Sequence, residues 1–61
     1  MYRVLAYFGG YELSHEGDFD NFYEAQEAFE RAKNRYLEGV DEDNLENEEE
    51  TFYFNSRIVE I

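Results

Sequence analysis

A chain of 61 residues has room for one domain with a small hydrophobic core, and we expect residues 1–61 to form that single domain. The absence of cysteine excludes disulfides and thiolate metal sites. Sixteen acidic against five basic residues give a net charge of −11, which argues against direct binding to nucleic acid or to an anionic membrane.

The start of the chain shows no sign of export or membrane insertion. Met1 is followed at once by a strand-like run, in place of the charged and apolar regions of a signal peptide. No apolar run approaches the roughly 18 residues that a membrane-spanning helix needs. We therefore expect a cytoplasmic protein.

The first expected element is a β-hairpin. Residues 1–8 are rich in β-branched and aromatic side chains, Gly9-Gly10 suits a type I′ turn, and residues 11–15 would form the returning strand. This register gives one face that is nearly all apolar, and it places Arg3 opposite Glu16 on the other face.

After a short connection over residues 16–19, a helix is expected over residues 20–39. An apolar stripe follows the helical period at Phe22, Ala25, Phe29, Ala32 and Tyr36. Asp20 or Asn21 would be the N-cap, and the glutamate three residues after Asn21 fits a capping box. Gly39 suits the left-handed conformation that often follows a helix.

Residues 40–50 differ in composition from the rest of the chain. The thirteen residues 38–50 hold eight acids and no base. Mutual repulsion predicts an extended or mobile acidic connection, in which Asp43 and Glu46 could cap one helical turn.

Residues 51–61 return to the composition of a strand. Phe52 and Phe54 would share one face of that strand. Asn55-Ser56 would either carry a bulge or turn a second hairpin, and we favour a single bulged strand.

These elements predict an α+β fold, a small ββαβ domain whose three-stranded antiparallel sheet has the order 2-1-3, with one helix packed on one face. The expected core, opposite the helix stripe, comprises Tyr2, Val4, Ala6, Phe8, Tyr11, Leu13 and either Phe52 or Phe54. The other face would stay uncovered and would carry Leu5, Tyr7, Tyr53 and part of the segment 57–59. An uncovered apolar and tyrosine-rich sheet face indicates an interaction surface.

No residue pattern predicts catalysis, a metal or a cofactor. Neither serine lies in a recognisable nucleophile context, and His15 is expected to be an ordinary histidine at the rim of the sheet. A calcium loop starting at Asp41 would place Leu45 at its fifth position and Glu46 at its sixth, which excludes that motif. We expect no enzymatic activity.

The acidic segment has two interpretations: a solvated connection, or a row of carboxylates that imitates the phosphates of a nucleic acid. Carboxylates three or four residues apart on a helix lie about 5–6 Å from each other, comparable with the phosphate spacing of a strand. The second interpretation predicts a surface that binds a basic protein. Its expected contact residues are Glu24, Glu27, Glu38, Asp41, Glu42, Asp43, Glu46, Glu48, Glu49 and Glu50, with Tyr7, Tyr23 and Tyr53 as aromatic contacts.

In composition the chain resembles inhibitors of host nucleic-acid enzymes that phages and mobile elements encode, such as anti-CRISPR and anti-restriction proteins. The resemblance implies a DNA-mimicking inhibitor that occupies the basic surface of a nucleic-acid-handling enzyme, in the host cytoplasm if a virus encodes it. The alternative is a structural or assembly module that forms a homodimer, or docks on a larger subunit, through its open sheet face.

Overall fold

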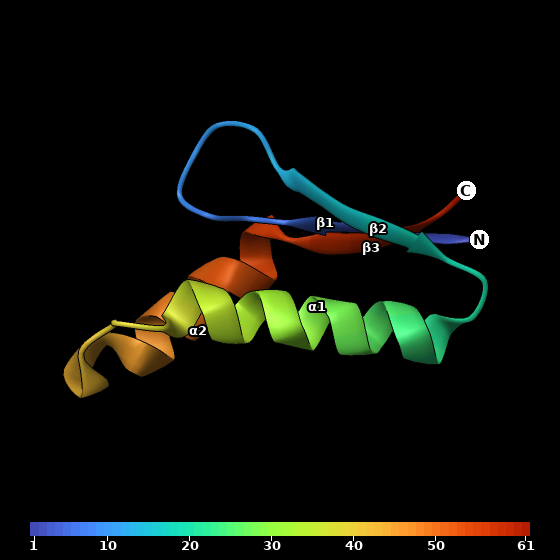
Figure 1. The fold of residues 1–61 in the computed structure, drawn as a ribbon. Helices are drawn as coiled ribbons and strands as arrows, with labels where there is room; N and C mark the ends of the chain where they lie inside the picture. The colour runs from blue at the N-terminus through green and yellow to red at the C-terminus, as the bar shows by residue number, and fades with distance from the viewer.

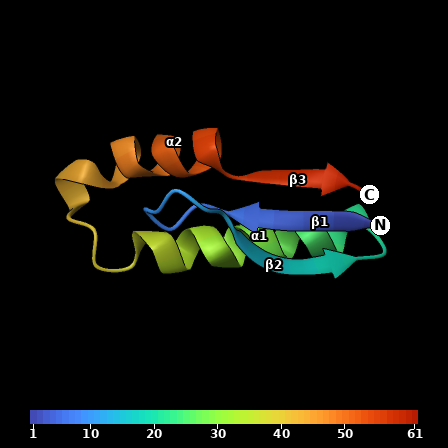
Figure 2. The same ribbon diagram turned by 90° about the horizontal axis from the view of Figure 1, so that it is seen from above.

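The computed structural model describes residues 1–61 as a three-stranded sheet with two helices on one side of it (Figures 1 and 2). The elements are β1 (Tyr2–Ala6), β2 (Ser14–Phe19), α1 (Phe22–Leu37), the short 3₁₀ helix η1 (Glu42–Asn44), α2 (Leu45–Asn55) and β3 (Arg57–Glu60). Both β2 and β3 pair antiparallel with the central β1, so the order is β2-β1-β3. The expected α+β class and the strand order 2-1-3 are confirmed, and a second helix is added.

The β1–β2 hairpin forms in a different register from the expected one. Residues 7–13 make a seven-residue loop in place of a two-residue turn, and Ala6 lies opposite Ser14. A bulge then shifts the register by one further residue, so that Val4 lies opposite Gly17. The strand therefore extends through the segment 16–19 that was expected to be a connection.

The observed register is favourable because it brings two more contacts into the fold. Phe19 reaches the core, where it packs against the buried residues. Arg3 pairs with Asp18, with a distance of 2.8 Å from Nε to Oδ1, and the expected partner Glu16 instead forms an ion pair with Arg35 of α1.

Helix α1 begins and ends where the sequence predicts. The side chain of Asn21 accepts a hydrogen bond of 2.9 Å from the backbone N–H of Glu24, which identifies Asn21 as the N-cap. Past the last turn Gly39 has a φ of +85°, the left-handed conformation that glycine adopts without strain.

The acidic segment and the residues after it form helical structure, so the predictions of a mobile connection and of a strand over residues 51–55 are both wrong. Within α2 the less exposed positions are Glu48, Thr51, Phe52 and Asn55. Their spacing of three and four residues is that of one helix face. Because 100° separates successive residues on a helix, Phe52 lies inside while Phe54 lies outside.

The core is small and built largely from alanine. It comprises Val4, Ala6, Ala25, Ala28, Phe29, Ala32 and Phe52, with Tyr2, Phe19, Tyr36 and Ile58 packed around it. Alanine on the buried face of α1 lets the helix approach the sheet closely, and the aromatic rings fill the space beside it. Phe29 and Phe52 meet edge to face with their centroids 5.2 Å apart.

Three residues of the expected core, Phe8, Tyr11 and Leu13, lie outside it because the loop replaces the tight turn. Tyr11 is fully exposed in the loop, and Phe8 is 41% exposed and lies against the guanidinium of Arg35, with 5.2 Å from Cζ to the ring centroid. No helix of the structure has the length and the apolar character that crossing a membrane requires.

Candidate interaction surface

Helix α2 lies beside the C-terminal half of α1, beyond the end of the sheet (Figures 1 and 2). A cluster of polar contacts joins the two helices around Lys33. The ammonium of Lys33 lies 2.9 Å from the carboxylate of Glu30 and 3.7 Å from that of Glu49, and it donates a 3.0 Å hydrogen bond to the hydroxyl of Tyr53. The hydrogen bond to Glu30, followed by the one to Tyr53, raises the pKa of Lys33, so it stays a cation.

A second polar contact joins the helices one turn further along α1. The hydroxyl of Tyr36 donates a 2.5 Å hydrogen bond to the carboxylate of Glu48, and this bond, reinforced by burial, raises the pKa of Tyr36 to about 12. Glu48 and Glu49 therefore attach α2 to α1 and are not free to contact another molecule fully.

The five other carboxylates of the acidic segment have no partner within the chain. Three of the five, Glu42 in η1 and Glu46 and Glu50 in α2, follow one another at intervals of four residues and are exposed. Side chains four residues apart lie one above the other on a helix, about 5–6 Å between Cβ atoms. We call these three residues the carboxylate column.

The column ends in an aromatic ring that the sequence analysis did not select. Phe54 lies four residues after Glu50 and is 89% exposed. The signal for this position was present in the sequence: Glu42, Glu46, Glu50 and Phe54 are all spaced by four, but the pattern is visible only if residues 45–55 are taken as a helix.

The three expected aromatic contacts have different environments. Tyr23 is 80% exposed at the start of α1. Tyr53 is 42% exposed, but its ring stacks on Phe29 and its hydroxyl lies between Lys33 and Glu30. Tyr7 is half-buried against Tyr36, with 5.7 Å between centroids, and not on the open sheet face. Only Tyr23 is as available as expected.

The acidic residues of α1 do not continue the carboxylate column. Glu24 and Glu27 lie in the N-terminal half of α1, at the far end from α2 (Figures 1 and 2). Glu27 lies 4.0 Å from Arg31, four residues later on the same helix. The predicted track is therefore divided between two ends of the molecule.

The remaining predicted acids lie around the connection between the helices. Glu38 is the C-cap of α1, Asp41 is the N-cap of η1 without a side-chain capping bond, and Asp43 lies within η1. All three are exposed, so they extend the negative surface near the start of the column.

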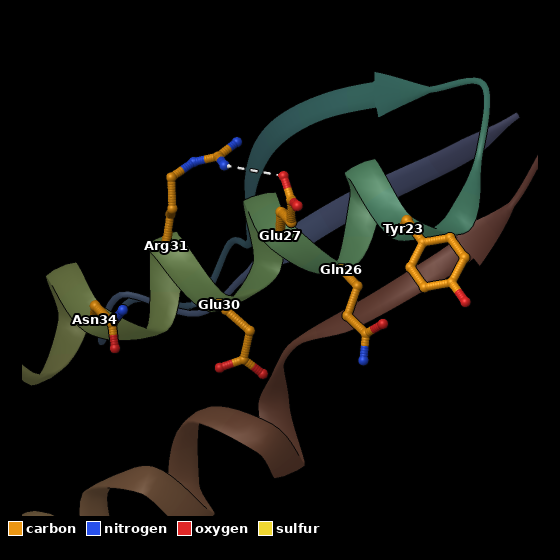
Figure 3. A pocket seen from close by; sticks show the side chains of 6 residues that line it. All are labelled: Tyr23, Gln26, Glu27, Glu30, Arg31 and Asn34. Atoms are coloured by element: carbon orange, nitrogen blue, oxygen red, sulfur yellow. Dashed lines mark ion pairs between the residues drawn. The ribbon is translucent and has the colours of Figure 1, made fainter.

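A shallow hollow lies on the outer side of α1 (Figure 3). Its lining residues are Tyr23, Gln26, Glu27, Glu30, Arg31 and Asn34. Glu27 and Arg31 project from one side of the helix, while Gln26 and Glu30 project from the other, toward β3 and α2 (Figure 3). The polar groups do not converge on a common point, and Glu30 is already bonded to Lys33.

The sheet face away from the helices carries a different charge pattern. Arg3 and His15 both contact Asp18, at 2.8 Å in each case, and the bond from Arg3, followed by the one from His15, holds the pKa of Asp18 well below its usual range. Arg57, on the neighbouring β3, is the one Arg or Lys side chain without an ion pair. Residues 20–55, in contrast, hold twelve acids and three bases.

No three side chains of the metal-binding types are grouped closely enough to hold a metal ion. Comparison with protein-family models, with curated proteins and with solved structures finds no match for this chain.

Proposed function

We propose that this protein is a small acidic inhibitor without catalytic activity, which binds the basic surface of a nucleic-acid-handling enzyme and occupies the place of the nucleic acid. The carboxylate column along η1 and α2 carries this proposal. Glu42, Glu46 and Glu50 are exposed and have no partner within the chain; Glu46 and Glu50 stand one turn apart on α2, and Glu42 precedes them on η1.

The total charge supports binding to a basic protein at long range, and the spacing of the carboxylates supports it at contact. A net charge of −11 attracts a basic protein surface from a distance and accelerates encounter. At contact, carboxylates about 5–6 Å apart can accept bonds from arginine and lysine side chains that otherwise hold phosphates. Action in the cytoplasm, on a CRISPR effector, nuclease, polymerase or DNA-binding regulator, belongs to the same proposal.

Affinity capture tests the proposal. The immobilised protein is exposed to a cell lysate, and retained proteins are identified with and without competing DNA or RNA. We expect a retained nucleic-acid-binding protein that is released by nucleic acid and by added salt, because both act on the same ionic contacts. Retention that neither salt nor nucleic acid reduces would contradict mimicry.

A matched pair of variants separates the column from net charge. One variant carries Glu42→Gln, Glu46→Gln and Glu50→Gln. The other carries the same number of changes at exposed acids elsewhere, Glu12→Gln, Asp20→Asn and Glu60→Gln. We expect the first to lose retention by a factor of ten or more and the second to lose much less, since each desolvated charge contact contributes about 1.5–3 kcal/mol.

A structural or assembly module remains the second candidate, and the open sheet face is the observation that favours it. Leu5 and Val59 are only partly covered there, no helix lies over them, and Arg57 is unpaired. A homodimer or a larger subunit docked on this face would cover them. Sedimentation of the purified protein tests the homodimer: association that Leu5→Ser abolishes favours this candidate, and a monomer at high concentration counts against it.

A further inference from the structure

The carboxylate column is followed along α2 by an exposed aromatic ring, that of Phe54. This ring bears on which class of nucleic acid the proposed inhibitor imitates. A phenylalanine that is 89% exposed makes almost no contact with its own fold, although Phe52, two residues earlier, is completely buried. Exposed single apolar residues are common on proteins, but this one stands one turn from Glu50 in a row of unpaired acids.

The order of groups along α2 matches single-stranded nucleic acid better than a duplex. A duplex keeps its bases stacked inside and presents phosphates and groove edges. A single strand exposes the flat face of each base beside its phosphates, and proteins that bind it combine a basic groove with aromatic side chains on which the bases stack. Negative groups followed by an accessible ring reproduce that combination.

We infer that α2 docks in a basic groove of its partner that normally binds single-stranded DNA or RNA, with the carboxylate column on the phosphate-binding cations and the Phe54 ring in a base-stacking position. This inference rests on the proposed function and specifies the class of nucleic acid that is imitated. Charge complementarity supplies the orientation, since the acids of the column all lie on the N-terminal side of the ring.

The Phe54 side chain is available for this role because the packing of the fold does not depend on it. Its ring takes no part in the aromatic cluster of Phe29, Tyr36, Phe52 and Tyr53. Removing it therefore changes the surface and leaves the core intact, so a binding defect in Phe54→Ala can be assigned to the ring.

The test compares two competitors and three variants. Proteins captured from a lysate by the immobilised chain are eluted with increasing amounts of either oligo(dT) or a mixed-sequence duplex. The two competitors are compared by their phosphate concentration. We expect oligo(dT) to release them at a concentration at least tenfold lower. Phe54→Ala should reduce retention roughly tenfold, within the range measured for loss of one base–aromatic stack. Phe54→Trp should restore it, and Tyr11→Ala, which removes an exposed ring from the loop between β1 and β2, should have no effect.

The outcomes separate the inference from the function on which it rests. Release by duplex as readily as by oligo(dT), or full retention by Phe54→Ala, overturns the single-strand assignment and leaves inhibition by mimicry standing. Unchanged retention by the variant that lacks the three carboxylates, or no retained protein at all, overturns both. The urea unfolding midpoint of Phe54→Ala, expected to equal that of the parent, verifies that the variant is folded.

Discussion

Phe52 and Phe54 lie two residues apart on α2 and have opposite environments, which makes them a natural pair for separating fold from surface. Phe52 is fully buried and its ring contacts Phe29, Tyr36 and Tyr53. Phe→Ala in a core costs about 3–5 kcal/mol, comparable with the whole stability of a domain this small. We therefore expect Phe52→Ala to be largely unfolded by circular dichroism at 25 °C. A cooperative unfolding transition close to that of Phe54→Ala would contradict this packing.

The hydroxyl of Tyr36 predicts how stability depends on pH. Its pKa rises to about 12 in the fold because the hydroxyl donates to Glu48, whereas an unfolded tyrosine ionises near 10. The folded state thus favours the protonated form, so its contribution is complete below pH 10 and is lost as the pH rises through about 12.

Urea unfolding of the parent and of Tyr36→Phe between pH 8 and pH 12 measures this contribution. Tyr36→Phe should be the less stable protein at pH 8, by about 1 kcal/mol. The difference should shrink as the pH rises, because only the parent loses a hydrogen bond to ionisation. Lys33 has the same raised pKa in both proteins, so the comparison removes its effect. Parallel pH profiles would contradict the assignment.

At the scale of elements, α1 was predictable because three independent local signals agree on it. Its apolar stripe, the Asn21 cap and Gly39 all act within the helix itself. The structure confirms the cap, the glycine and four residues of the stripe, while the fifth, Phe22, is 47% exposed. The sequence also predicted the strand order, because a helical crossover most easily returns the last strand beside the first.

Helix α2 was missed because two local tendencies disagree with the packing that decides it. Thr51 and the aromatic residues after it favour a strand, and the glutamates before them repel each other. The fold overrides both, since helical spacing places Phe52 in the core and sets Glu48 against Tyr36. The prediction of the candidate site was incomplete for the same reason. The acids were predicted, but only the helix shows which carboxylates bind α1, which have no partner, and that Phe54 is exposed.

The β1–β2 register was missed because it depends on a bulge at Gly17. This glycine has a φ of +149°, and an added Cβ would lie 2.9 Å from Cζ of Phe19, whose ring packs against the core. We expect Gly17→Ala to lower the free energy of unfolding by about 1–3 kcal/mol, measured in urea.

Gly10→Ala is the matched control for that experiment. Gly10 lies in the loop without a positive φ, and a Cβ there meets no atom within 4 Å. Its substitution should change stability by no more than about 0.5 kcal/mol. Equal effects at the two glycines would show that the bulge does not require glycine.

At the scale of the whole molecule, the charge is distributed by layer. The helical layer carries most of the excess acid, while the sheet face away from it holds the Arg3–Asp18–His15 cluster and the unpaired Arg57. The molecule is about 15 Å across in its thinnest direction, so the charges of both layers remain close to water and sensitive to salt. A partner of high positive charge should consequently meet the helices first.

This distribution makes an overall prediction about stability. Sixteen acids against five bases repel one another more than the few ion pairs attract, so added salt should stabilise the fold. We expect the urea midpoint to rise between 0.05 and 0.5 M NaCl, because the screening length falls from about 10 Å at 0.1 M to about 3 Å at 1 M. Glu50→Gln should make this rise smaller, and Gln26→Glu, which adds a charge one turn from Glu30, should make it larger. A midpoint that falls with salt would show that the ion pairs stabilise the fold by more than the repulsion among the acids destabilises it.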